Sequence, residues 1–404
     1  NEYLKYVVAE PDVTMEQITD YLLNLKQGSY MLQVTPEFKH ITIGGAVNGL
    51  GIESSSCKYG LFEKTIFKYE VLLTDGSVIE ATANNQYKDL FYALPGSYGT
   101  FGLITKIYLY IVPAGKYVRT NYRVLENTKN IENEFKKRIE SKNCEFMEGL
   151  VMEEKVILSY SNCVNYISLY QWLFNTSRFN YSWSKWYYNH IRDITDKHTK
   201  YLEFIPIKDY LFRWDRGAFW FASNRMKCNW YNRIMYGSEL TSQKLYQRAK
   251  KKDIYNREKE KVVQDLLVPL DNMCDFTNSI KEICNVFPLW LCPIKTFSGE
   301  DNIFSLPSED DIYVDVGVYG SWEENKNLNS DKPDFLIKNK EIEDKLYHND
   351  GLKFLCNMNY YDEGFFWNIY DKKKYDEIKK KYDEGNKLLN IYEKVCSFYI
   401  KNDK

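Results

Sequence analysis

The pattern of apolar and polar residues near the N-terminus predicts a short strand followed by an amphipathic helix. Apolar side chains recur at helical spacing through the segment 14–26. Thr14, followed three residues later by Gln17, matches a capping box, which is a signal for the start of a helix. We therefore expect a helix over 14–26, reached from a strand at 4–9.

The next regular pattern is a hairpin. Two apolar runs within 65–82 surround Asp75 and Gly76, and an Asp-Gly pair between such runs is a strong hairpin signal. A short helix fits 88–94, and 105–112 alternates like a half-buried strand. Strands and helices are mixed here without the regular strand–helix–strand rhythm of a parallel sheet.

Beyond about residue 114 the chain becomes richer in Trp, Tyr and charged residues, and we expect a domain boundary there. Strand-like segments return at 145–152, 155–161 and 311–320, and helical patterns fill 241–260 and 371–385. The charged side chains of the last helix are interpreted as a solvated face rather than as a basic binding patch.

Composition narrows the classes of partner and site. A chain of 404 residues favours two domains, or one domain with a large insertion. The formal net charge of −2 gives no overall electrostatic signature of nucleic-acid or anionic-membrane binding. Aromatic residues make up 16% of the chain, which suits pockets for flat or greasy ligands, although nucleotide-biased coding explains the same excess equally well.

Cysteine and histidine spacing argues against a metal site. The nine cysteines include no C-x-x-C pair, and the four histidines form no H-x-x-H pair, so we expect neither a zinc site nor metal catalysis. Unpaired cysteines favour an intracellular, reducing compartment. The longest apolar run, 286–294, is too short to cross a membrane.

The candidate chemistry begins with a stretch of small residues between Thr42 and Ser56. Its four glycines let backbone N–H groups approach a ligand without an intervening Cβ. The spacing is not that of the G-x-G-x-x-G dinucleotide fingerprint, and no P-loop lysine follows. Taken alone, the stretch is a turn or a ligand-binding loop.

A second small-residue stretch, 94–105, strengthens the ligand interpretation. Gly96, Gly99 and Gly102 follow one another at intervals of three residues between a predicted helix and a predicted strand. Such spacing lets the chain pass close to a bound cofactor. Two stretches of this kind on either side of one hairpin favour a shared ligand site.

Together these stretches resemble the FAD-binding domain of the vanillyl-alcohol oxidase/p-cresol methylhydroxylase type. Within that class, the segments "GIESSS", "KYGLF" and "DLFYA" are similar to the delta-24 sterol reductase (Diminuto/seladin) family, whereas "GTFGLIT" is typical of the wider flavoprotein class. Further segments are similar to that family in the same order: "FMEGL" (146–150), "LEFIPIKDYLFRWDRGAFW" (202–220), "VVQDLLVPL" (262–270), "FPLWLCP" (287–293), "YVDVGVYG" (313–320) and "GFFWNIYD" (364–371). The resemblance covers nearly the entire chain.

The resemblance implies an α+β fold in three parts. Residues 1–113 are expected to be the second part of an FAD-binding domain, incomplete at its N-terminus. Residues 114–355 are expected to form a substrate or cap domain with an antiparallel sheet flanked by helices. Residues 356–404 are expected to be C-terminal helices that return to the FAD domain.

The resemblance also assigns cofactor-binding residues. The first stretch is expected to contact FAD mostly through backbone groups, and Ile104 falls where related flavoproteins place main chain near the adenine. The implied residues are Thr42, Ile43, Gly44, Gly45, Ala46, Val47, Asn48, Gly49, Leu50, Gly51, Ile52, Glu53, Ser54, Gly96, Ser97, Gly99, Thr100, Gly102 and Ile104.

The chain departs from the family pattern in two places. Cys57 stands where the family commonly has a histidine, so any role of that ring does not transfer. The chain also starts after the point where the family's membrane anchor and first flavin subdomain would lie. We expect either a longer natural protein or an FAD site built from half of the usual walls.

No motif identifies the proton donor that alkene reduction needs. The catalytic candidates are Glu203, Arg213, Arg216 and Tyr313. The arginines could bind the phosphate of a nicotinamide cofactor or stabilise an anionic flavin, and Tyr313 or Tyr319 could line the pocket or donate a proton. The alternative for the arginines is a structural ion-pair cluster, such as Asp209 with Arg213 on a helix. The alternative for the tyrosines is packing on a strand.

The function implied by the resemblance is NADPH-dependent reduction of a sterol side-chain double bond, with FAD as cofactor. The alternatives are an FAD-linked oxidase or dehydrogenase of an alcohol, sugar lactone or other lipid, and a redox-inactive binding or regulatory protein. The expected partner is a sterol or another apolar small molecule, without nucleic acid. The implied location is the endoplasmic reticulum membrane surface if an anchor precedes the chain, and otherwise the cytoplasm.

Overall fold

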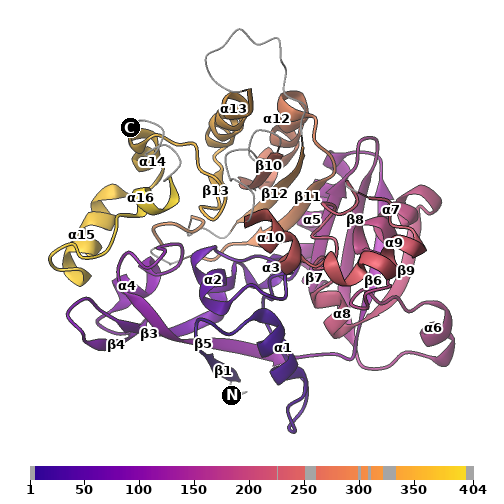
Figure 1. Ribbon diagram of the computed structural model, residues 1–404, viewed down its shortest axis with the longest axis horizontal. Coiled ribbons are helices and arrows are strands. Elements are labelled where there is room, and N and C mark those ends of the chain that lie inside the picture. Colours follow the sequence, from indigo (N-terminus) through magenta and orange to yellow (C-terminus); the bar gives the residue numbers. More distant parts are fainter. Residues whose placement is uncertain are drawn as a thin grey trace.

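Two antiparallel sheets organise the protein in the computed structural model (Figure 1). The structure describes residues 5–224, 226–250, 261–298, 302–307, 311–321 and 334–396. The first sheet has the order β1-β5-β3-β4, and β2 also pairs with β5. Its strands are β1 (Tyr6–Ala9), β2 (Tyr30–Leu32), β3 (Ile66–Leu72), β4 (Val78–Thr82) and β5 (Leu103–Pro113).

Short helices accompany the first sheet: α1 (Met15–Leu23), α2 (Ile43–Asn48), α3 (Ser56–Tyr59), the 3-10 turn η1 (Phe62–Thr65) and α4 (Lys88–Ala93). The predicted first helix is confirmed, with Thr14 and Gln17 forming the capping box. The predicted hairpin is confirmed as the antiparallel pair β3 and β4.

The second sheet has eight strands in the order β13-β10-β12-β11-β7-β8-β6-β9, and each neighbouring pair is antiparallel. The strands are β6 (Tyr117–Leu125), β7 (Phe146–Val151), β8 (Val156–Val164), β9 (Lys200–Pro206), β10 (Lys261–Pro269), β11 (Leu289–Lys295), β12 (Ile312–Ser321) and β13 (Leu352–Lys353). The predicted strands at 145–152, 155–161 and 311–320 are β7, β8 and β12.

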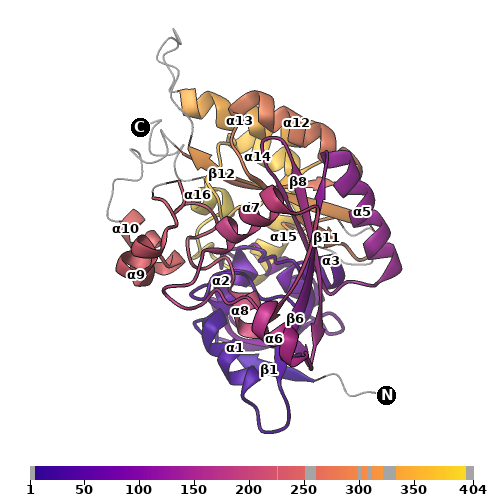
Figure 2. The same ribbon diagram turned by 90° about the vertical axis from the view of Figure 1, so that its right-hand side faces the viewer.

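Three helices cover one face of the second sheet: α5 (Thr128–Ser141), α12 (Met273–Cys284) and α13 (Asp334–His348) (Figure 2). Val314, Val316 and Val318 of β12 pack in the core beneath these helices. Because side chains alternate along a strand, Tyr313, Asp315 and Tyr319 point to the opposite, inner face.

Further helices of the described residues connect or flank the two sheets. They are α6 (Leu169–Phe174), α7 (Tyr187–Lys197), α8 (Ile207–Leu211), α9 (Trp230–Tyr236), η2 (Gly237–Glu239), α10 (Ser242–Lys250), η3 (Leu270–Asn272), α14 (Glu363–Ile369), α15 (Lys372–Tyr382) and α16 (Ile391–Val395). The helix predicted over 241–260 is observed as α10, and residues 251–260 lie outside the described residues.

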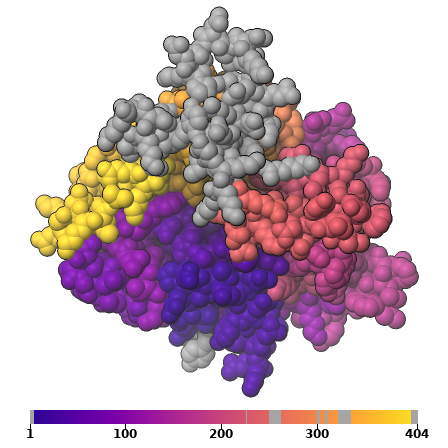
Figure 3. Space-filling view, viewed as in Figure 1, coloured from indigo at the N-terminus to yellow at the C-terminus, as the bar shows by residue number. Residues whose placement is uncertain are grey.

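The C-terminal helices pack against the unit that contains the first sheet, as the space-filling view shows (Figure 3). Lys381 and the Tyr382 hydroxyl both contact Asp89 of α4, each at 2.7 Å. Lys379 donates to the carbonyl of Thr100 at 3.0 Å. The mixture of helices with antiparallel sheets confirms the α+β class, while the division into domains at 113 and 355 stays a prediction.

Candidate functional site

The fold brings the two small-residue stretches together. The Gly96 N–H donates to the carbonyl of Val47 at 3.2 Å. A Cβ placed on Gly96 would lie 3.6 Å from the Leu50 side chain. The first stretch begins with α2, whose N-cap Thr42 accepts from the Gly45 N–H at 3.0 Å. Residues 42–54 and 94–102 are therefore in direct contact through Val47, Leu50 and Gly96.

The predicted cofactor residues differ in how far they can reach a ligand. Fully or nearly fully buried are Ile43, Ala46, Val47, Leu50, Ile52, Glu53, Ser54, Gly96, Ser97, Thr100 and Gly102. Half-buried are Thr42, Gly44, Asn48, Gly49, Gly51, Gly99 and Ile104, and Gly45 is exposed. Because the apolar side chains belong to the core, contact with a cofactor would come mainly from the glycines and the polar groups.

Polar atoms beside this surface lack partners, as expected of a ligand site. The Asn48 side-chain oxygen and the Tyr98 hydroxyl are buried without a hydrogen bond to any residue that the structure describes. Burial raises the pKa of Tyr98 well above its usual value, so its hydroxyl remains a neutral donor. Gly99 has a positive φ of 70°, and a Cβ there would be in ordinary contact with the Gly102 carbonyl oxygen at 3.6 Å. These features fit a polar, extended cofactor such as FAD.

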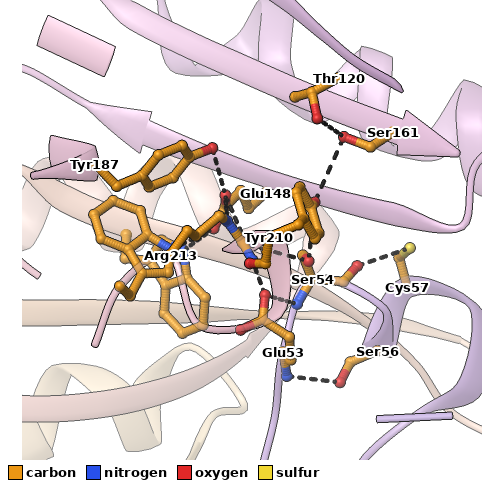
Figure 4. A network of polar contacts seen from close by, with 12 residues as sticks. Glu53, Ser54, Ser56, Cys57, Thr120, Glu148, Ser161, Tyr187, Tyr210 and Arg213 are labelled. Atoms are coloured by element: carbon orange, nitrogen blue, oxygen red, sulfur yellow. Dashed lines mark hydrogen bonds and ion pairs between the residues drawn. The ribbon is translucent and has the colours of Figure 1, made fainter. Parts of the chain in front are cut away.

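A buried group of charges stands behind the first stretch (Figure 4). Arg213, just after α8, contacts Glu53 at 2.7 Å and Glu148 of β7 at 2.8 Å. All three side chains are at most 2% exposed. Burial opposes the charge of Arg213, but the two carboxylates outweigh it and raise the pKa of the guanidinium. The sheet, the glycine-rich stretch and the segment after α8 are thus joined by one cation.

Neutral donors complete the coordination of the carboxylates. The indole N–H groups of Trp214 and Trp290 donate to Glu148 at 3.0 Å and 2.9 Å. The Ser54 N–H donates to Glu53 at 2.8 Å. Burial nevertheless raises the pKa of Glu53, with Arg213 opposing the shift and Glu148 adding to it. One Glu53 oxygen keeps no hydrogen-bond partner among the described residues.

The four catalytic candidates do not form one group. Arg213 contacts the predicted flavin stretch through Glu53. Glu203 lies on β9 and accepts from Tyr122 at 2.7 Å, with His190 at 2.9 Å. Arg216 donates to backbone carbonyls, including that of Ser184 at 2.8 Å, and burial lowers its pKa to about 10.

Tyr313 lies on the inner face of β12 beside a pocket of about 630 Å³. The loop 302–307 and residues of β13 and α14 line the same pocket. None of the residues lining this pocket belongs to 42–54 or 94–102, but the loop 302–307 also contacts Gly96 through Phe304. The strand tyrosine is 7% exposed, as expected of a packed aromatic side chain.

The ion pair suggested for Asp209 and Arg213 is wrong. Asp209 accepts the backbone N–H groups of Phe179 and Asn180, at 2.7 Å and 2.9 Å. Arg213 instead reaches carboxylates that are 160 and 65 residues away in the sequence. Helical spacing identifies neighbours along the chain. The partners of Arg213 come instead from β7 and from the first glycine-rich stretch.

Four acidic residues near the site were not among the candidates predicted from the sequence: Glu37, Glu148, Asp265 and Asp315. A signal for three of them was present, because each interrupts an apolar strand where a charged side chain is costly to bury. Glu37 has no such signal, since it lies in the irregular segment after β2.

Comparisons with known proteins match both halves of the chain. A family model described as an FAD binding domain matches residues 2–82. A Delta(24)-sterol reductase of Macaca fascicularis is 30% identical over 96% of this chain and 74% of its own length. The chain belongs to the delta(24)-sterol reductase family. A member from Homo sapiens is 29% identical over the same shares, and one from Arabidopsis thaliana is 28% identical over 95% and 72%.

A wider relationship is limited to part of the chain. Cytokinin dehydrogenase 4 of Oryza sativa subsp. japonica is 27% identical over 29% of this chain. The match to sterol reductases therefore extends well beyond the match to this other enzyme. In the part of the chain that the structure describes, no helix is long and apolar enough to span a bilayer. The same residues contain no group of three or more His, Cys, Asp or Glu side chains suited to a metal.

Replacing the central cation should destabilise the fold strongly. Arg213→Met leaves Glu53 and Glu148 buried without their counter-ion, and we expect a loss of about 3–5 kcal/mol in the free energy of unfolding. Because the guanidinium opposes the raised pKa of Glu53, the loss should shrink as pH falls. Urea unfolding at several pH values measures both effects.

The matched control is Arg178→Met, because the Arg178 side chain is 42% exposed and 4.0 Å from Asp209. A surface pair of this kind contributes less than about 1 kcal/mol. Equal losses for the two variants would contradict a central role for Arg213.

Two glycines of the second stretch offer a test of how closely it packs. Gly96 and Gly99 have φ values of 72° and 70°, so alanine strains both backbones similarly. A Cβ on Gly96 would lie 2.8 Å from the Phe304 Cβ, whereas the nearest atom for Gly99 is 3.6 Å away. We expect Gly96→Ala to lose a further 1–3 kcal/mol or so relative to Gly99→Ala. Chemical denaturation of both variants measures the difference, and indistinguishable midpoints would contradict it.

Proposed function

We propose that the chain is an FAD-dependent oxidoreductase that reduces the side-chain double bond of a sterol, with NADPH as the source of the hydride. The observation that carries the proposal is the extent of the similarity to Delta(24)-sterol reductases, which covers 96% of the chain. It therefore includes the eight-stranded sheet as well as the FAD-binding domain. The name of those relatives gives the substrate class and the bond that is reduced.

The residues of the predicted cofactor surface have separate tasks under this proposal. Bound FAD would supply hydride transfer between the nicotinamide and the substrate. The glycines of 42–54 and 94–102 would let the backbone N–H groups face the cofactor at close range. Asn48 and Tyr98 would direct their unpartnered polar atoms towards it. Arg213 would hold the first stretch against the sheet, since it contacts Glu53 and Glu148 simultaneously.

The proposed cofactors and substrate class are tested by two half-reactions. The purified chain, loaded with FAD, should show flavin absorbance that bleaches on anaerobic addition of NADPH. Subsequent addition of a sterol with a side-chain double bond should restore the oxidised spectrum and yield the saturated sterol. Each transfer moves one hydride, so the two steps should balance.

Other outcomes separate the alternatives. Bleaching by an alcohol but not by NADPH would indicate an oxidase or dehydrogenase. Absence of protein-bound flavin after free FAD has been removed would indicate a redox-inactive protein. Bleaching by NADPH without reoxidation by any sterol would support reduction of the flavin by NADPH and would refute the substrate class.

We also propose that the protein works at a membrane surface, where an apolar sterol is available. Two short helices, α6 and α9, contain no buried residue and lie on the right-hand side of the molecule in Figure 1. Leu169 and Phe174 of α6 are 73% and 70% exposed, and Trp230 and Ile234 of α9 are 68% and 62% exposed. Exposed Trp, Phe and aliphatic side chains on one side favour an interfacial contact.

Local charge supports the same surface. Residues 155–192 and 216–238 contain no Asp or Glu, while Lys185 and Lys227 are among their basic residues. The net charge of −2 for the whole chain hides this local excess of positive charge. An anionic bilayer surface is therefore a better partner for these segments than the overall composition suggests.

The membrane contact predicts a specific loss of vesicle binding. Leu173→Ser combined with Phe174→Ser on α6 should lower co-sedimentation with phosphatidylcholine–phosphatidylserine vesicles, because less apolar area enters the interface. Val78→Ser combined with Leu103→Ser is the control, since these side chains are 59% and 63% exposed on the first sheet. Equal binding of both double variants and the unaltered chain would contradict a role for α6.

A further inference from the structure

The inner face of the second sheet presents carboxyl groups near the predicted cofactor surface. Asp265 of β10 pairs with Gly317 of β12, and Asp315 occupies the next position on the same face of β12. A Cβ on Gly317 would lie 2.7 Å from the Tyr319 hydroxyl, so the tyrosine ring folds back over that glycine. The Tyr319 hydroxyl then donates to Asp265.

The Asp265 carboxyl is held at both oxygens. Tyr319 donates to one oxygen, and the Asn357 side chain donates to the other at 2.8 Å. Asp265 is half-buried, whereas Asp315 is fully buried. Among these two acids, Asp265 is therefore the one with surface that a bound molecule can touch.

A short path connects Asp265 to the first glycine-rich stretch. A Cβ on Gly49 would lie 3.7 Å from the Cβ of Cys356. Cys356 is exposed and directly precedes Asn357, the residue that donates to Asp265. Gly49 and Asp265 are thus both next to the 356–357 segment, one from each sheet unit.

Asp315 provides a separate sign that this face is built to meet a ligand or hold a proton. It is 0% exposed, and neither carboxyl oxygen has a hydrogen-bond partner among the described residues. Burial raises the pKa of Asp315 well above its usual value, and the charges of Asp265 and Glu37 add to the shift. The Leu266 N–H opposes the shift but does not cancel it. Burial and the neighbouring acids thus both disfavour ionisation of Asp315.

The pKa of Asp265 is set by different neighbours. Burial raises its pKa as well, but hydrogen bonds from Tyr319 and Asn357 and the charge of Lys353 lower it again. Lys353 is itself paired with Glu343 at 2.5 Å. The other titratable groups that interact with this pair of acids are Glu37, Cys292 and Cys356. Asp265 therefore changes protonation more easily than Asp315.

We propose that Asp265 is the catalytic acid that protonates the substrate carbon during alkene reduction, with Tyr319 and Asn357 as positioning residues. This inference rests on the proposed function. Bound FAD in its reduced state would supply a hydride to one carbon of the alkene, and the other carbon needs a proton. The O–H bond of Asp265 breaks, a C–H bond forms, and the electron pair stays on Asp265 as a carboxylate. Solvent then returns the proton.

The geometry stabilises the product state of Asp265. After the proton has left, the new carboxylate is met by the donors on Tyr319 and Asn357. Asp315 has no comparable donors, so ionising it is much more costly. Arg213 and Glu203 are less suited, because Arg213 is committed to two carboxylates and Glu203 lies on β9, at the far edge of the sheet.

The test separates the two half-reactions of the FAD-loaded chain. In the Asp265→Asn variant, NADPH should bleach the flavin as fast as in the unaltered chain. Reoxidation of the flavin by sterol should slow by about 100-fold or more. Asp271→Asn, in the exposed η3 turn after β10, is the control and should reoxidise at nearly the unaltered rate. A wild-type chain that never reoxidises with sterol would refute the proposed function rather than this assignment.

Three outcomes would overturn the assignment itself. They are rapid reoxidation of Asp265→Asn, a large loss in Asp315→Asn alone, and a large loss in Glu37→Gln alone. A large loss in Glu37→Gln would make Glu37, in the segment after β2, the acid instead. Burial likewise raises the pKa of Glu37.

The positioning role has a signature in the pH profile. Reoxidation should slow as pH rises through the pKa of Asp265, because the acid form is lost. Tyr319→Phe removes a donor to the carboxylate, which raises that pKa and moves the falling limb to higher pH. A merely structural role for Tyr319 would lower the rate without moving the limb.

A measurement without any cofactor checks the protonation states. Carboxyls whose folded pKa is raised weaken the fold as pH rises from their unfolded value, near 4, through the folded value. Asp315→Asn and Asp265→Asn should each remove part of this fall, with the larger change for Asp315. Identical pH–stability curves for both variants and the unaltered chain would contradict the raised values.

Discussion

The contact of Arg213 with Glu53 and Glu148 is the constraint on which the arrangement of the site depends. The three groups come from the segment after α8, from the end of the first glycine-rich stretch and from β7. They are fully buried, so none can turn to water if the others move. A glycine-rich stretch has little side-chain packing of its own, and this ion group fixes its far end against the second sheet.

The same constraint explains why backbone can serve as a binding surface. Val47 accepts from Gly96, and Met147 of β7 donates to the Ser54 carbonyl at 2.8 Å. The middle and the C-terminal end of the first stretch are therefore tied to neighbouring segments by main-chain hydrogen bonds. Glycines between these hydrogen bonds let a ligand approach the backbone closely. The hydrogen bonds limit the conformational freedom that glycine gives the chain.

The sequence predicted local elements better than the contacts between them. The capping box at Thr14 and the Asp-Gly pair at 75–76 act over a few residues, so their patterns identified α1 and the β3–β4 hairpin. The partners of Arg213 lie 65 and 160 residues away, and no spacing rule reaches that far. The family resemblance identified the FAD-binding domain and the α+β class. The roles of the individual site residues remain predictions.

Within the described ranges, some buried acids of the protein are paired with cations, and others are not. Where structure alone is at stake, acids meet cations, as Glu343 meets Lys353 and as Glu148 meets Arg213. Asp315 lies on the inner sheet face with no such partner among the described residues, although a nonpolar side chain would cost less there. An acid kept at this cost, next to Asp265 and one short segment from Gly49, is better explained by chemistry at the interface of the two sheet units than by packing.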